Sequence, residues 1–181
     1  AASDVYKRQV YNREEAKAAV ANHPLSFLNI DRAETQFDDT VDTYDERVYQ
    51  KARDLLWDMV EKGDFIREKK RCYYIYELTM DGRTQTGITA CASIDDYANG
   101  VIKKHENTRA EKEADRIHHV DTCNAQTGPI FLAYRSNKRI NEVVDRVKSS
   151  DTPVYDFVAD DWIRHCVLSL IHISEPTRRS Y

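Results

Sequence analysis

A β-hairpin constrains the fold of this chain more than any other feature of its sequence. The run CYYIYELT (72–79) is strongly β-forming, and it is followed by Asp81-Gly82 and then by RTQTGITACA (83–92). An Asp-Gly pair between two β-forming runs is a strong signal for a tight antiparallel turn. The fold is therefore expected to include an antiparallel sheet.

Helical patterns alternate with this hairpin. Apolar residues recur at three- and four-residue spacing, and capping and stop residues flank several of these stretches. The predicted helices begin at Asn12 and end before His23-Pro24, run from Tyr44 to Val60 with Gly63 as the stop, and cover 94–102, 109–123 and 140–147.

Two further strands and a second hairpin complete the expected elements. Buried strands are predicted at 25–30 (LSFLNI) and 130–134 (IFLAY), a hairpin at 153–158 and 163–167, and a polar loop at 31–42. Helices that alternate with hairpins indicate the α+β class. We expect a mixed, largely antiparallel sheet with hairpins and three to five packed helices, forming an incomplete domain.

Both ends of the chain resemble translated sequencing-adapter sequence. Residues 1–9 (AASDVYKRQ) match one adapter arm, and residues 168–181, beginning LSLIHISEPTR, match the opposite arm. We therefore expect residues 10–167 to be a fragment of a longer protein and residues 168–173 to carry no evolved structure. Without the two ends the net charge changes from −4 to −6.

Composition narrows the class of function. An acidic domain is a poor match for the phosphate backbone of nucleic acid, so nucleic acid is an unlikely partner. No apolar stretch approaches the ~20 residues of a membrane span. The four cysteines form no CxxC pair, which favours reduced thiols of a cytoplasmic protein over a zinc or redox motif. The absence of P-loop and GxGxxG motifs excludes Walker-type and Rossmann nucleotide sites from this sequence.

The densest group of reactive side chains is KKHENTR (103–109), before the predicted helix at 109–123. It combines three cations, an imidazole, a carboxylate and a hydroxyl, a mixture that phosphoryl transfer needs. The alternative interpretation is a solvated charged helix face. A zinc-protease motif fails because Arg109 stands where HExxH needs its second histidine, and we expect no metal ligands here. Downstream, Arg116 and Asn124 belong to a second polar group that is typical either of a cleft or of helix capping.

Four stretches together resemble the bacterial and archaeal family known as domain of unknown function 1015. They are NREEAKAAVANHPLSFLNIDRAE, CYYIYELTMDGRTQTGITACASIDDY, VIKKHENTRAEKEADRIHHVDTCNAQTGPIFLAYR and PVYDFVADDWIRH. Members of the family are longer at both ends. They carry a C-terminal DGHHR motif that resembles free-serine kinases with a ParB and sulfiredoxin-like fold. Where Asp160-Asp161-Trp162 stands, they commonly have an Asp-Gly turn.

The resemblance implies that the full-length protein phosphorylates free L-serine or a similar small hydroxy metabolite. The phosphate donor would be a nucleotide or pyrophosphate, with Mg²⁺ as a candidate cofactor. Glu106 would act as the base, assisted by His105. The phosphate- and ligand-binding residues would be Lys103, Lys104, Thr108, Arg109, Arg116 and Asn124. We expect the fragment itself to be inactive.

Two other classes of function stay open. The chain could be a non-catalytic module that binds a nucleotide or another ligand, or that regulates a partner. A ParB-like link to nucleic acid is the third reading, although the acidic charge argues against it. The oligomeric state is left open by the sequence.

Overall fold

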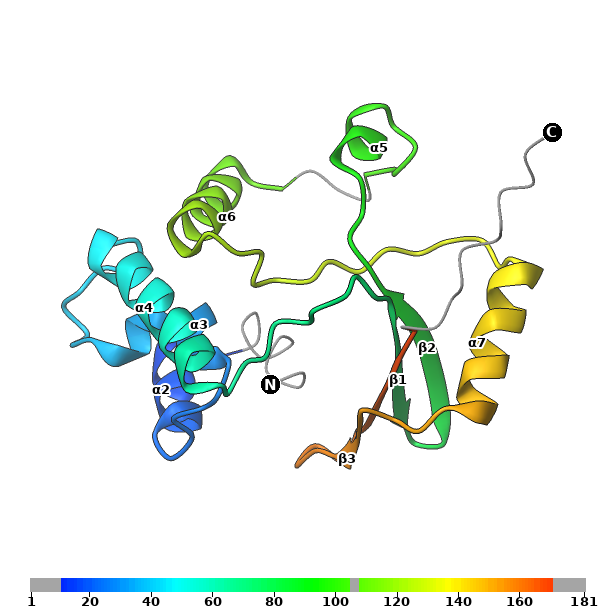
Figure 1. Cartoon of the computed structure of the whole chain (residues 1–181). Helices are drawn as coiled ribbons and strands as arrows, with labels where there is room; N and C mark the ends of the chain where they lie inside the picture. The colour runs from blue at the N-terminus through cyan, green and yellow to red at the C-terminus, as the bar shows by residue number, and fades with distance from the viewer. Residues whose placement is uncertain (1–10, 105–107, 171–181) are drawn as a thin grey trace. The chain divides into compact units, whose positions relative to one another are not determined.

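The chain forms two compact units, each built from two segments that are distant in sequence. The computed structural model describes residues 11–104 and 108–170. The helical unit comprises the described residues of Ala1–Arg67 and Lys104–Leu132, and the sheet unit comprises those of Glu68–Lys103 and Ala133–Tyr181. Figure 1 shows the elements of each unit coloured by position along the chain.

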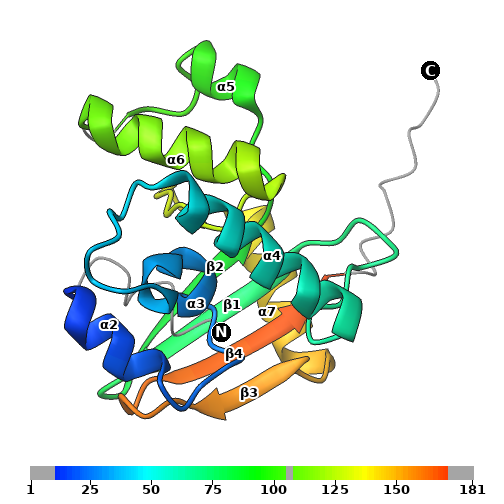
Figure 2. The ribbon, with the colours of Figure 1, turned by 90° about the vertical axis from the view of Figure 1, so that its left-hand side faces the viewer.

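The helical unit is built around its longest helix, α4. Its elements are α2 (Arg13–Val20), α3 (Leu28–Asp31), the 3₁₀ helix η1 (Ala33–Gln36), α4 (Glu46–Lys62) and α6 (Ala110–Cys123). Helix α4 packs against α3 and lies beside α6 (Figure 2). The main core of this unit consists of Ile30, Ala33, Val48, Ala52, Leu56, Met59 and Cys123.

Local capping explains where these helices begin and end. The side chain of Asn12 accepts a hydrogen bond from the Glu15 amide and the Glu15 side chain binds the Asn12 amide, which confirms the predicted capping box. Asp45 caps α4, and Gly63 ends it with a left-handed φ of 81°. The predicted helix stop at Gly63 is therefore confirmed.

The predicted strand at 25–30 is wrong, because this segment forms turns and helix α3. The side chain of Asn29 donates to the carbonyl groups of His23 and Pro24, which favours a compact turn over an extended strand. The helical turn directs Leu28 into one core cluster and Ile30 into another. The short apolar run at 25–30 therefore contributes side chains to two core clusters and forms no strand of the described sheet.

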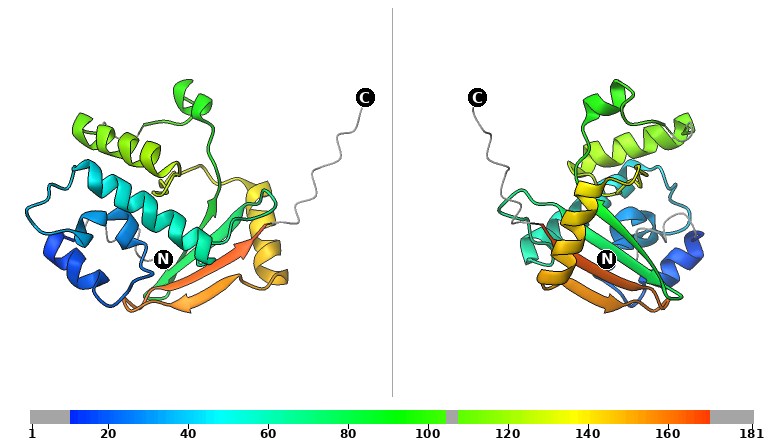
Figure 3. Two further views of the ribbon diagram at one scale, coloured as in Figure 1. Left: turned by 60° about the vertical axis from the view of Figure 1, so that its left-hand side comes forward. Right: turned by 90° about the vertical axis from the view of Figure 1, so that its right-hand side faces the viewer.

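The sheet unit contains one four-stranded antiparallel sheet. Its elements are β1 (Tyr74–Met80), β2 (Arg83–Thr89), α5 (Ile94–Ala98), α7 (Lys138–Ser150), β3 (Tyr155–Val158) and β4 (Arg164–Ser169). The strand order is β2-β1-β4-β3, as Figure 2 shows. Helix α7 lies against the sheet (Figure 3), and Val147 of this helix joins a core with Ile75, Cys166 and Leu168.

Both predicted hairpins are confirmed. Met80 pairs with Arg83 across the first turn, where Asp81 and Gly82 both have positive φ, 50° and 74°. Two left-handed residues give the type I′ turn that an Asp-Gly pair favours. The second hairpin joins β3 to β4 and places Trp162 in the left-handed region at φ 63°.

The α+β class with hairpins and a largely antiparallel sheet is confirmed, but the predicted strand at 130–134 is wrong. The described residues contain six α-helices, one of which, α3, stands where another strand was predicted. The run at 130–134 is irregular and pairs with none of the four described strands, and its Phe131 is 79% exposed. A β-forming composition makes a strand only where a partner edge is available.

Strand β4 extends into the segment that we expected to carry no evolved structure. Leu168 pairs with Ile75 of β1 and is buried, and Leu170 is buried as well. An apolar β-forming segment can pack against a sheet edge whatever its origin. The adapter origin of residues 168–181 therefore stays a prediction.

Candidate functional site

The helical unit contains a cavity of about 300 Å³. It lies among α3, η1, α4 and α6. Its apolar lining consists of Ile30, Ala33, Val48 and Ala52, and its polar lining consists of Asp31, Arg32, Glu34, Thr43, Tyr44, Tyr49, Lys112, Asp115 and His119. Several polar groups thus meet over an apolar floor, which is the usual character of a small-molecule site.

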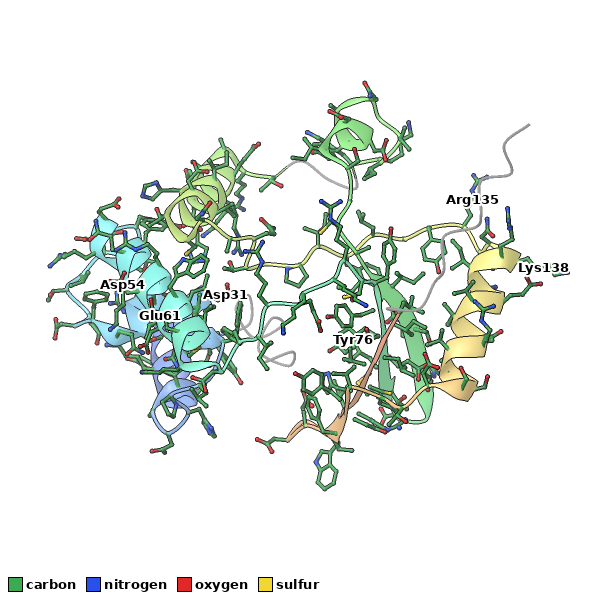
Figure 4. All side chains as sticks on the ribbon, in the orientation of Figure 1. Asp31, Asp54, Glu61, Tyr76, Arg135 and Lys138 are labelled. Carbon is green, nitrogen blue, oxygen red and sulfur yellow. The ribbon has the colours of Figure 1, made fainter. Side chains whose placement is uncertain are left out.

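Two acidic residues from the α3–η1 segment are buried at this cavity. Asp31, labelled in Figure 4, is 5% exposed at the end of α3, and Glu34 is buried in η1. The Arg32 guanidinium binds the Glu34 carboxylate through Nε, and its Nη1 donates to the Tyr11 carbonyl at 2.8 Å. A buried carboxylate requires such compensation. Arg32 therefore balances the charge of Glu34.

Helix α6 contributes a charged wall from one of its faces. Lys112, Asp115 and His119 are spaced three and four residues apart, so their side chains share a side of the helix. The Tyr49 hydroxyl of α4 donates to Asp115 Oδ1 at 2.8 Å, which orients this carboxylate. Lys112 Nζ donates to the Tyr44 hydroxyl at 2.9 Å and lies 5.5 Å from the centre of the Tyr44 ring. Links from α6 to α4 and to Tyr44, which precedes α4, therefore hold the polar wall in place.

His119 and Cys123 form a buried pair beside the cavity. His119 is 4% exposed, and its Nε2 lies 3.8 Å from Cys123 Sγ. Burial, with the nearby charge of Asp31, raises the pKa of the Cys123 thiol to about 11. The sulfur is protonated at neutral pH, so it packs as a small apolar group rather than as a nucleophile.

The described residues that the sequence predicted for phosphate binding at 103–109 do not line this cavity. His105 and Glu106 fall outside the described residues. Lys104, Thr108 and Arg109 are exposed in the helical unit, and Lys103 is exposed in the sheet unit. Arg109 is the N-cap residue of α6 and makes no side-chain capping bond. None of these described residues lines the cavity.

The structure separates the second predicted group from the first. Asn124 is the C-cap of α6, with a left-handed φ of 49°, whereas Arg109 is the N-cap of the same helix. The two caps are about 20 Å apart along the axis. Arg116 is exposed, and it does not line the cavity. Asn124 and Arg109 therefore do not form one compact site.

Sequence reasoning missed the groups that line the cavity. Asp31 and Glu34 fell in a stretch that we predicted to be a solvated loop, and nothing local distinguishes them from exposed acids. The spacing of Lys112, Asp115 and His119 was a usable signal, because it places three ionisable groups on one helical face. Tyr49 was hidden within the apolar stripe of α4.

The sheet unit contains a separate group of polar contacts. The Tyr76 hydroxyl, on β1 in Figure 4, lies 2.7 Å from His165 Nδ1, and the Phe157 ring stacks on the imidazole at 5.1 Å. Burial lowers the pKa of His165, against an opposing effect of Asp161. On the α7 side, Lys148 pairs with Glu77, which also accepts a hydrogen bond from Thr86 at 2.7 Å. Glu77 thus has two partners within the unit, whereas His165 Nε2 is buried without a hydrogen-bond partner among the described residues.

Two further observations on the described residues concern metal binding and membrane-spanning helices. Among residues 11–104 and 108–170, no three His, Cys, Asp or Glu side chains gather as metal ligands. In the same part of the chain, the helices are too short or too polar to cross a lipid bilayer.

The fold and the cavity define an α+β protein whose helical unit has a small cavity with a largely polar lining. The chain belongs to the family described as "protein of unknown function (DUF1015)", whose model matches residues 1–177. The predicted family resemblance is thereby confirmed. Neither a curated protein nor a solved structure matches the chain.

Proposed function

We propose that the complete protein is a kinase that phosphorylates the hydroxyl group of a small metabolite, L-serine or a close relative. The cavity of the helical unit would hold this acceptor. The observation that carries the proposal is its size and lining: about 300 Å³, with carboxylate, ammonium, phenol and imidazole groups over an apolar floor. This volume is at the lower end of ligand pockets, so it suits an amino-acid-sized acceptor better than a nucleotide.

The phosphate donor would lie at the start of α6. The segment KKHENTR leads directly into this helix, whose first-turn amide groups attract anions. Lys104 and Arg109 supply positive charge nearby in sequence, while Glu111 and Glu113 in the first turn offset part of it. Because the same helix carries Lys112 and Asp115 to the cavity, α6 supports both the donor and the acceptor role.

The groups of the KKHENTR segment would carry out the proposed phosphoryl transfer. The acceptor hydroxyl oxygen forms a bond to the terminal phosphorus as the bond from that phosphorus to the bridging oxygen of the donor breaks. Glu106 takes the hydroxyl proton, and His105 assists it. Such a base contributes about 10²–10⁴ in rate. Lys104 and Arg109 neutralise the oxygens of the transferring group.

The direct test is phosphoserine formation by an intact family member that carries KKHENTR, supplied in turn with labelled ATP and pyrophosphate. Glu106→Gln should lower the rate at least about 100-fold. The control Glu61→Gln changes an exposed acid of α4 that does not line the cavity and should retain the rate. Unchanged turnover in Glu106→Gln would remove the base assignment. Absence of labelled product with every donor and small hydroxy acceptor would exclude the kinase.

A non-catalytic binding module is the second candidate. The observation that favours it is that the cavity includes none of the predicted phosphate-binding residues among the described part of the chain. Binding of a small ligand without any transferred phosphate would support this class. The nucleic-acid alternative is weaker, since the chain has a net charge of −4. Strongly salt-dependent DNA binding would revive it.

We also propose a cytoplasmic location. The four cysteines Cys72, Cys91, Cys123 and Cys166 are free thiols. Reduced thiols are typical of the cytosol. Fractionation of cells that express the tagged complete protein tests this proposal.

A further inference from the structure

We propose that Cys72 and Cys91 form a reversible disulfide across the β1–β2 hairpin, at the end opposite its Asp81-Gly82 turn (Figure 1). This end of the sheet unit is then a site of thiol oxidation. Both thiols are free in the structure, which represents the reduced state of the pair. The inference does not depend on the proposed kinase, because it involves neither the cavity nor a phosphate donor.

The strand register sets the two cysteines opposite one another. Tyr74 is the partner of Thr89, and each step away from the turn moves one residue back before β1 and one residue forward after β2. Two steps beyond this pair, position 72 meets position 91. Directly opposite residues of antiparallel strands have Cα atoms about 4.5 or 5.5 Å apart, and a disulfide needs about 4.4–6.8 Å. Both kinds of pair are therefore within range of a disulfide.

The backbone at this end of the hairpin allows the register to continue. The amide of Leu170 donates to the carbonyl of Tyr73 at 2.7 Å, so pairing on the β4 side extends one residue before β1 begins at Tyr74. Residues 71–73 and 90–93 form neither a helix nor a turn. Two further residues on each side can therefore pair without the loss of another element.

The side chain of Cys72 lies on the face that the disulfide requires. It shares a hydrogen bond with the Tyr74 hydroxyl, and this bond, together with burial and Glu68, raises the pKa of the phenol. Thr89 is on the same face as Tyr74, because direct partners in a ladder share a face. Cys91 follows Thr89 by two residues, which returns an extended chain to that face.

Accessibility separates this pair from the other two thiols. Cys91 is exposed and Cys72 is partly buried, whereas Cys123 and Cys166 are buried. Burial raises the pKa of the two buried thiols, which disfavours the reactive thiolate. Cys166 pairs with Glu77, which is about 17 Å along β1 from Cys72 and too far for a bond between sulfurs.

Glutathione disulfide is a suitable oxidant for the pair. The Cys91 thiolate attacks one of its sulfurs, the bond between the two glutathiones breaks, and one glutathione thiolate leaves. The Cys72 thiolate then attacks the sulfur of Cys91, and the second glutathione leaves. The cysteines lose two electrons to the oxidant, and the released glutathione thiolates take up the protons of the two thiols. Excess reduced glutathione reverses both steps.

The test is to equilibrate the folded 181-residue chain in glutathione buffers, alkylate the free thiols and map the tryptic peptides by mass. Each cysteine falls in a different tryptic peptide, so a link between peptides 72–83 and 84–103 identifies the disulfide. Cys123 and Cys166 should be recovered as alkylated thiols. The equilibrium constant for the link should be at least about tenfold higher in the folded chain than in urea, because the folded hairpin holds the two cysteines together.

A matched control moves the thiol by one residue. Cys91→Ser combined with Ala90→Cys keeps an exposed thiol in the same segment but places it on the other face of the extended chain. Its link to Cys72 should form at least about tenfold less readily. Circular dichroism confirms that the variant is folded.

Three results would overturn the proposal. The first is glutathione bound to Cys72 and Cys91 separately, with no link between the two peptides. The second is equal linking in the Ala90→Cys control, and the third is no gain of the folded chain over the chain in urea. The kinase proposal fails separately, through absence of product in the assay of the intact family member.

Discussion

The two units handle their buried polar groups in different ways. In the helical unit, acidic, basic and imidazole side chains from three parts of the chain surround a cavity of about 300 Å³. In the sheet unit, Glu77 binds Lys148 and Thr86, and Tyr76 binds His165 Nδ1, while His165 Nε2 is buried without a hydrogen-bond partner among the described residues. Polar groups around a void are suited to a ligand, whereas polar groups packed together specify a fold. The comparison favours the proposal that the helical unit, rather than the sheet unit, holds the ligand.

The largest expected effect is on the stability of the sheet unit. Lys148→Met leaves the buried Glu77 carboxylate without its cation, which should lower the free energy of unfolding by about 1–3 kcal/mol at pH 7. Although burial opposes ionisation, the bonds from Lys148 and Thr86 keep the pKa of Glu77 below its usual 4.5. Urea denaturation of both proteins measures the difference.

The pH dependence of that difference has a definite sign. A depressed carboxyl pKa stabilises the fold above the unfolded pKa, and this contribution is lost as the pH falls through the folded pKa. The gap between the wild type and Lys148→Met should therefore narrow below about pH 4. Equal stabilities at pH 7 would show that the pair does not support the sheet unit.

A matched pair of tyrosine changes tests the comparison directly. Tyr76→Phe removes the hydroxyl beside His165 and should lower the free energy of unfolding by about 0.5–1.5 kcal/mol, with L-serine affinity unchanged. Tyr49→Phe removes the hydroxyl that orients Asp115 and should weaken L-serine binding severalfold. Titration and denaturation of both variants give the two readouts. Loss of affinity in Tyr76→Phe alone would reverse the assignment of the units.

The last expected effect is a gain in stability at the second hairpin. Trp162 has a φ of 63° and a side chain that is 87% exposed, so it is strained without compensating burial. Trp162→Gly should raise the free energy of unfolding by about 1 kcal/mol, because glycine adopts this conformation without a clash. Trp162→Ala keeps the strain and serves as the control. An equal gain in both variants would remove strain as the explanation.

Local signals predicted most of the fold, and the cavity required tertiary structure. Asn12, Gly63 and the Asp81-Gly82 pair act on their own neighbours, so the sequence alone showed their roles. The segments at 25–30 and 130–134 failed because their structure depends on which surfaces are available to cover them.

The cavity could be predicted only in part for the same reason. Asp31 and Asp115 are far apart in sequence, and only the packing of α3 and α6 around α4 brings them to one space. The local sequence signal for the cavity was the spacing of Lys112, Asp115 and His119, which places them on one face of a helix. The KKHENTR segment was predicted as the functional site because its charged residues are adjacent in sequence. Proximity in sequence does not establish that residues share a site.

The most direct test of the central claim is a titration of the ¹⁵N-labelled chain with L-serine, followed by amide NMR shifts. The account predicts that the largest shifts occur at 30–34, 43–52 and 112–119, around the cavity of the helical unit. The amides of β1, β2, β3 and β4 should stay near their original positions. Largest shifts around Tyr76 and His165, or no shifts at saturating L-serine, would contradict the claim that the helical unit holds the ligand.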